Sequence, residues 1–113
     1  MLLQIDFSSE VPIYLQIRNQ IVMGIAEGKL QAGEKLPTIR SLADETGINM
    51  MTVNKAYQVL KQEGYITADR RNGASVSGDV ASNKSLSEKA IENLRLILSE
   101  AYLSGISRES MLE

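Results

Sequence analysis

The sequence predicts a mainly α-helical fold with one small β-hairpin, followed by a separate helical tail. Through most of the chain, apolar residues recur at intervals of three and four, which is the spacing of one helical face. Around the Asn72-Gly73 pair the pattern changes to short extended segments, which favours a hairpin. A run of small and polar residues then precedes a last apolar stripe.

The composition excludes several classes of chemistry. The chain has 113 residues, enough for one domain with a small appendage, and a net charge of −2 that favours no particular partner. It contains neither cysteine nor histidine, which excludes disulfides, thiolate zinc sites and Cys or Ser–His nucleophiles. We therefore expect no metal and no cofactor. The carboxylates fall singly, which predicts that the protein is not an enzyme.

No part of the sequence has the pattern of a membrane or export signal. The most apolar window, Ile21 to Ala26, is far shorter than the roughly 20 residues that cross a bilayer. The first residues lack the basic flank of a secretory signal. We therefore expect a cytoplasmic protein that does not associate with membranes.

The first predicted helix has Pro12 in its first turn and ends at Gly28. Residues 30–34 then form a short extended piece and a turn. The inner face of this helix is marked by apolar residues at spacings of three, four and four, namely Tyr14, Ile17, Ile21 and Ile25.

Two shorter helices with a glycine between them come next. One spans residues 38–46 with Thr38 as its N-cap, and the other spans residues 49–63 with Asn49 as its N-cap. Gly47 ends the first of them.

A hairpin and a tail complete the chain. The expected strands are 65–68 and 74–76, and after a polar linker Ser87 caps a fourth helix. The sequence therefore predicts a domain over residues 10–78, and a linker with a C-terminal helical segment over residues 79–113.

Two short helices joined by a glycine turn and followed by a basic hairpin form the pattern of a winged helix-turn-helix. In this motif the N-terminal residues of the second helix contact base edges, and the hairpin reaches the backbone or the minor groove. Asparagine pairs with adenine, threonine bonds several bases, and lysine binds phosphate or guanine. We therefore predict double-stranded DNA as the partner, contacted by Asn49, Met50, Thr52, Asn54, Lys55, Arg70 and Arg71.

The same residues also allow plain structural roles. Asn49 is typical of an N-cap, and Arg40, Lys55 and the hairpin arginines are typical of a solvated surface. Met50 and Met51 are flexible thioethers that fill gaps in a core, and we expect one to face the core and the other the DNA. The alternative function is a winged helix that serves as a protein-interaction module without specific DNA readout.

The apolar stripe of the tail helix is wider than a helix needs when it leans on a small domain. Packing against the first helix is one way to cover it. Pairing with a second copy covers more of it and suits a pseudo-palindromic site. We therefore predict a homodimer held by Ile91, Leu94, Leu98, Ala101 and Tyr102. Any small-molecule effector would bind at the dimer interface or between the domains, because the tail is too short to enclose a pocket.

Several runs within residues 11–77 resemble the GntR family of bacterial winged-helix regulators. They include Pro12-Ile13-Tyr14-Leu15-Gln16-Ile17, Leu36-Pro37-Thr38-Ile39-Arg40-Ser41-Leu42-Ala43 and Leu60-Lys61-Gln62-Glu63-Gly64. The short tail is similar to that of the YtrA subfamily, whose members dimerise through C-terminal helices. The resemblance implies a repressor, often of neighbouring transporter genes.

The candidate DNA-binding set also includes Thr38, Arg40, Asn72 and Gly73. The resemblance implies that Arg40 clamps a phosphate, and Gly73 matches the last glycine of the family's wing. Met50 stands where many members have an arginine that reads guanine. The operator sequence therefore cannot be taken over from a relative.

Overall fold

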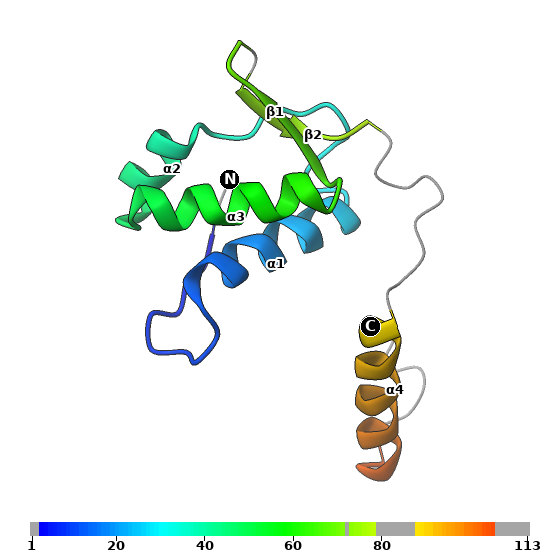
Figure 1. The fold of residues 1–113 in the computed structure, drawn as a ribbon. Coiled ribbons are helices and arrows are strands. Elements are labelled where there is room, and N and C mark those ends of the chain that lie inside the picture. The colour runs from blue at the N-terminus through cyan, green and yellow to red at the C-terminus, as the bar shows by residue number, and fades with distance from the viewer. Residues whose placement is uncertain (1–2, 72, 79–87, 106–113) are drawn as a thin grey trace. The chain divides into compact units, whose positions relative to one another are not determined.

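The computed structural model describes residues 3–71, 73–78 and 88–105. Its elements in chain order are α1 (Ile13–Ala26), α2 (Ile39–Thr46), α3 (Met50–Gln62), β1 (Ile66–Asp69), β2 (Gly73–Val76) and α4 (Glu88–Leu103). This order confirms the predicted fold class, mainly helical with one small hairpin (Figure 1).

The chain divides into two compact units, Met1–Ser82 and Asn83–Glu113, and each is described by itself. The first unit holds the three helices α1 to α3 and the hairpin, and the second holds α4. The predicted linker after Gly78 and the predicted cap Ser87 lie outside the described residues.

Helix α1 begins one residue later than predicted. Pro12 is its N-cap, with a ψ of 145° that is not helical, so the ring precedes the first turn and does not lie within it. The helix ends at Ala26, two residues before the expected stop. Its buried residues, Ile17 and Ile21, are among those that the apolar spacing predicted.

The turn between α2 and α3 has the predicted chemistry. Gly47 takes a φ of +74°, and its N–H donates to the carbonyl of Ala43 at 2.9 Å, which ends α2. A side chain at Gly47 would meet no atom within 4 Å, so the backbone conformation and not space requires glycine. Thr38 and Asn49 are the N-caps of α2 and α3, as predicted.

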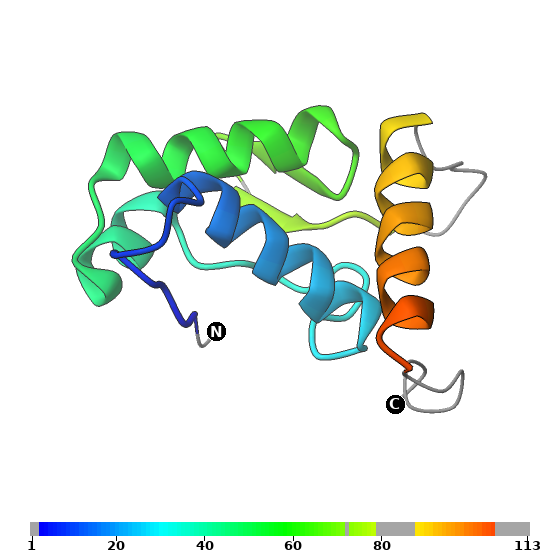
Figure 2. The ribbon, with the colours of Figure 1, turned by 90° about the horizontal axis from the view of Figure 1, so that it is seen from below.

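The core of the first unit lies where α3 packs against α1 and against α2 (Figure 2). The C-terminal part of α3 also meets β1. The largest fully enclosed side chains here are Ile17, Ile21, Leu42, Val53, Leu60, Ile66 and Val76. This shared core fixes the mutual orientation of the helix-turn-helix and the hairpin.

The hairpin pairs β1 and β2 antiparallel, with Ile66 opposite Val76 and Asp69 opposite Gly73. Strand β1 begins and ends one residue later than predicted, and β2 begins one residue earlier than predicted. The segment 33–36, which overlaps the end of the extended piece and turn predicted over residues 30–34, adds a further edge to the sheet. Its backbone bonds join Gly33 to Val76 at 2.9 Å and Leu36 to Ala74 at 2.9 Å.

Helix α4 has 16 residues, and none of them is buried. Its apolar side chains at 91, 94, 97, 98 and 102 are all exposed. Within the described ranges, no helix is both long and apolar enough to cross a membrane.

Candidate nucleic-acid interface

The outer surface of α3 lies opposite its buried side, which consists of Val53, Ala56, Tyr57 and Leu60. At its N-terminal end, Met51 is 80% exposed and Met50 is 50% exposed. The prediction that one of these methionines faces the core is wrong. Ile48 and Val53 fill the core at this end of the helix, so neither thioether is needed there.

The two N-cap side chains that were predicted to contact DNA already hold helix ends. The Oδ1 of Asn49 accepts a hydrogen bond from the N–H of Met51 at 2.7 Å, and the Oγ1 of Thr38 accepts one from Ser41 at 3.0 Å. The amide NH₂ of Asn49 and the hydroxyl proton of Thr38 are donors that capping does not use. Both residues are exposed, so each cap retains a donor for an acceptor such as a phosphate or a base.

Two interactions between elements fix the position of α3. The hydroxyl of Tyr57 donates to the carbonyl of Pro37 at 2.7 Å, which ties α3 to the segment before α2. Burial raises the pKa of Tyr57 to about 12, so the phenol stays a donor throughout the neutral range. The guanidinium of Arg18 in α1 donates twice to the carboxylate of Glu63, at 2.9 Å each, just after α3 ends.

Arg40 lies in the first turn of α2 and is exposed. In the part of the chain that the structure describes, it makes no ion pair. A guanidinium in this position is available to a phosphate, in keeping with its predicted role.

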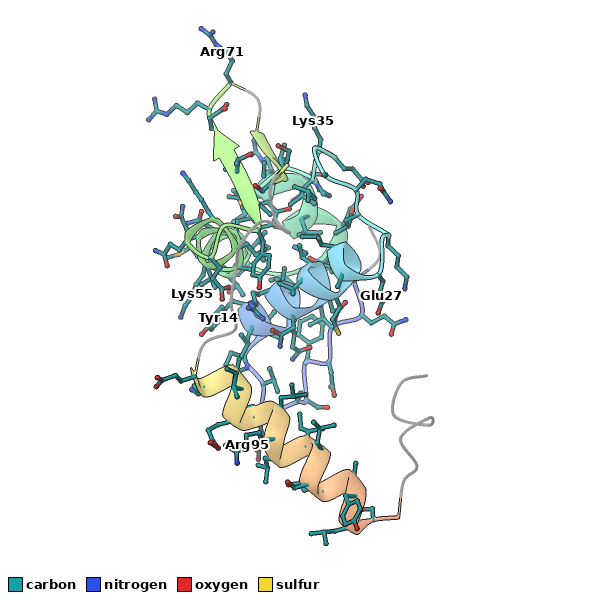
Figure 3. The ribbon with its side chains drawn as sticks, turned by 90° about the vertical axis from the view of Figure 1, so that its right-hand side faces the viewer. Tyr14, Glu27, Lys35, Lys55, Arg71 and Arg95 are labelled. Carbon is teal, nitrogen blue, oxygen red and sulfur yellow. The ribbon has the colours of Figure 1, made fainter. Side chains whose placement is uncertain are left out.

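Lys55 has a partner inside the domain that the sequence did not indicate. Its Nζ lies 4.1 Å from the centre of the Tyr14 ring. Figure 3 shows the two side chains next to each other. A cation at this distance from an aromatic face is attracted to it. Lys55 therefore lies at the α1 side of the outer surface of α3.

A groove of about 180 Å³ runs between α3 and the hairpin. It brings together three predicted residues, Thr38, Asn54 and Gly73. Gln58 and Lys61 line it too, and the sequence analysis did not select them as DNA contacts. Their positions, four and seven residues after Asn54, are the signal that could have found them, because residues at this spacing share one helix face.

The tip of the hairpin carries the two predicted arginines. Arg70 and Arg71 are exposed, and Arg71 points away from the body of the unit (Figure 3). The carboxylate of Asp69 accepts a hydrogen bond from the N–H of Arg71 at 2.8 Å, which shapes the turn. Gly73 follows with a φ of +71°, and the predicted Asn72 lies outside the described residues.

Lys35 adds a cation to this surface that the sequence analysis did not select. Its backbone forms an isolated antiparallel β-bridge with Ser75 at the further edge of the sheet. Its side chain points to the same side as Arg71 in Figure 3. Local pattern could not reveal this placement, because the bridge joins residues 40 positions apart.

Residues 13–76 match the profile of a known protein family, whose description is "Bacterial regulatory proteins, gntR family". The chain belongs to the GntR family. The match covers more than half of the chain and includes α1, α2, α3 and the hairpin.

Two Bacillus subtilis proteins match over nearly the whole chain. The HTH-type transcriptional repressor YtrA is 32% identical over 99% of this chain and 88% of its own length. The uncharacterized HTH-type transcriptional regulator YhcF is 31% identical over 96% of this chain and 90% of its own length.

Solved structures agree with this assignment. YtrA from Sulfolobus acidocaldarius, a GntR-family transcription factor, is 40% identical over 97% of this chain and 90% of that chain, with a TM-score of 0.63. A transcriptional antiterminator from Listeria monocytogenes is 32% identical over 98% of this chain and 84% of that chain, with a TM-score of 0.74. AraR(DBD) in complex with operator ORX1 is 26% identical over 68% of this chain and 99% of that chain, with a TM-score of 0.61.

These likenesses identify the surface formed by α2, α3 and the hairpin as part of a GntR DNA-binding domain. The protein is a DNA-binding regulator of transcription, and its family consists of regulators and not of enzymes. The predicted resemblance to the GntR family, and within it to YtrA, is confirmed.

A second hollow of the GntR unit lies away from this surface. It has a volume of about 850 Å³ and is formed by the N-terminal segment, α1 and the turn after it, with Leu3, Gln20, Met23 and Leu30 among its lining. None of its lining residues belongs to α3 or to the hairpin. The first unit thus contains a hollow of several hundred Å³. The sequence analysis did not predict it, because it expected an effector to bind only at the dimer interface or between the domains.

Proposed function

We propose that the protein is a transcriptional repressor that binds a pseudo-palindromic operator as a homodimer. The observation that carries this proposal is the presence, in one chain, of a GntR domain and a tail helix whose apolar side is exposed. The similarity to the repressor YtrA of Bacillus subtilis extends over 99% of the chain, tail included, which supports the repressor role.

In the proposed complex, residues 10–78 form the DNA-binding domain. The first turn of α3 enters the major groove, where Thr52 and Asn54 contact base edges. Arg40 and the exposed arginines of the hairpin neutralise phosphates. These phosphate contacts position the domain on the duplex but do not specify its sequence. Support for this arrangement comes from the exposure of Asn54, Arg40 and the two hairpin arginines, and from the place of Asn54 in the groove between α3 and the hairpin.

Residues 79–113 serve the dimer in this proposal. Ile91, Leu94 and Leu98 recur at spacings of three and four and are exposed, so they form one apolar side of α4. A contiguous apolar patch of this kind marks an interface. A second copy of the same helix, related by a two-fold axis, covers the patch on both chains at once and sets two recognition helices at a fixed spacing.

The proposal includes a place of action and a class of target genes. Operators lie on chromosomal DNA, so we place the protein in the cytoplasm. The likeness to the YtrA subfamily extends the proposal to transporter genes as targets.

Selection of duplexes from a randomised library with the full chain tests the proposal. We expect enrichment of an inverted repeat whose half-sites lie about one helical turn apart. Sedimentation of the selected complex should give two chains per duplex. Failure to enrich any sequence, or a single half-site bound by one chain, would overturn the proposal.

A further inference from the structure

The first turn of α3 carries no charged side chain. It consists of Met50, Met51, Thr52 and Val53, and Asn54 follows. The first cation along the helix is Lys55, whose ammonium group lies over the Tyr14 ring. The end of α3 that meets base edges therefore consists of amide, hydroxyl and thioether groups.

These groups differ in which base pair they suit. Guanine presents two acceptors in the major groove and is best read by the forked donors of arginine or by lysine. Adenine presents an acceptor and a donor that match the amide of asparagine, and thymine presents a methyl group that takes an apolar contact. The N-terminal end of α3 offers an amide and a large apolar group but no free cation. It therefore suits an A·T pair better than a G·C pair.

Met51 lies on the outer surface of α3, at the N-terminal end of the helix. It precedes Asn54 by three residues, Lys55 by four and Gln58 by seven, so all share one face of the helix. The groove lined by Asn54 and Gln58 lies on one side of this face and the Tyr14 contact of Lys55 on the other. With 80% of its surface exposed, Met51 has few contacts of its own in the free protein.

We propose that Met51 contacts the C5-methyl group of a thymine, and that Met51 and Asn54 together make the first turn of α3 a reader of A·T pairs. This inference rests on the proposed function, in which α3 enters the major groove. Contact with the methyl group removes apolar surface of both partners from water, which stabilises the complex. The flexible thioether adapts to the position of the methyl group without strain in the helix.

The test uses duplexes selected with the full chain and compares thymine with uracil, which lacks the methyl group. At the thymine that Met51 contacts, uracil should weaken wild-type binding about fourfold, the value for loss of one buried carbon. In a Met51→Gln variant the two duplexes should bind with equal affinity. Met23→Gln changes an exposed methionine of α1 and serves as the matched control, which should keep the wild-type preference for thymine.

A second pair of duplexes checks the methyl group in another base. With cytosine at that position the affinity should fall, and 5-methylcytosine should restore about fourfold of it in the wild type and none in Met51→Gln. The uracil comparison needs only the wild-type chain, so equal affinity for thymine and uracil at every position refutes the proposal even if the variant does not fold.

The outcomes separate this inference from the proposed function. If the selected half-site has only G·C pairs under the start of α3, or if uracil binds the wild type as well as thymine at every position, the role of Met51 is refuted while the repressor proposal stands. If no duplex is enriched at all, the proposed function fails and the inference falls with it.

Discussion

The hydroxyl of Tyr57 in α3 donates a hydrogen bond to the carbonyl of Pro37 at 2.7 Å, across 20 residues of chain. It joins the middle of α3 to the segment that leads into α2. Since Thr38, the next residue, caps α2, this bond holds the two helices of the motif in register with each other. This buried phenol therefore helps to set the angle at which α3 projects from the domain.

Tyr57→Phe should destabilise the domain by about 1 kcal/mol, because the hydrogen bond is lost and the Pro37 carbonyl loses its donor. The phenyl ring keeps most of the packing. Urea unfolding followed by circular dichroism measures the difference. Tyr102→Phe, which alters an exposed tyrosine of α4, is the matched control and should leave the midpoint unchanged. An unchanged midpoint in Tyr57→Phe would show that the bond contributes nothing to stability.

The same phenol predicts a dependence of stability on pH. Burial raises the pKa of Tyr57 from 10.0 to about 12, so the folded state favours the neutral form. Its contribution is complete below pH 10 and is lost as the pH rises towards 12, by about 2–3 kcal/mol in total. The advantage of about 1 kcal/mol that the wild type has over Tyr57→Phe should accordingly shrink and then reverse across this window. A constant difference between the two proteins would contradict the assignment.

Arg40→Ala should weaken binding to all duplexes by a similar factor, because a phosphate contact does not depend on sequence. The slope of log affinity against log salt should fall by about one. Salt titrations on a selected and a scrambled duplex measure both quantities. Lys29→Ala removes a cation paired with Glu27, remote from α2 and α3 in the sequence, and should have little effect. A slope that stays at the wild-type value would remove Arg40 from the interface.

Leu94→Asp should dissociate the proposed dimer, because it places a charge in the middle of the apolar side of α4. Binding to the full operator should then fall by a factor on the order of 10² or more, since a monomer engages one half-site. Ser99→Asp adds the same charge to the same helix outside the apolar side and should remain dimeric. Sedimentation and gel shifts on the same samples report both properties. A Leu94→Asp protein that is still dimeric would refute the role assigned to the tail.

Features set by neighbouring residues were predictable from the sequence. The caps Thr38 and Asn49 and the left-handed Gly47 depend on local hydrogen bonds and backbone conformation, and the structure has all three. The hairpin was predictable for the same reason, to within about one residue.

Features set by contacts between distant segments were not predictable. The pairing of 33–36 with β2 and the position of Lys55 over Tyr14 depend on how elements pack. The methionines show the same limit, because helical spacing alone did not reveal that Ile48 and Val53 already fill the core beside them. Sequence pattern thus indicated a candidate interface, while packing determined which of its side chains remain exposed.

Readout of bases by α3 is the central claim, and one binding experiment tests it most directly. Fluorescence anisotropy gives the affinities of the wild type and of Asn54→Ala for the selected duplex and for a scrambled duplex of equal length and composition. We predict that Asn54→Ala costs about 1–3 kcal/mol on the selected duplex and far less on the scrambled one. Equal losses on both duplexes would contradict the claim, because they would mean that Asn54 does not distinguish one sequence from another.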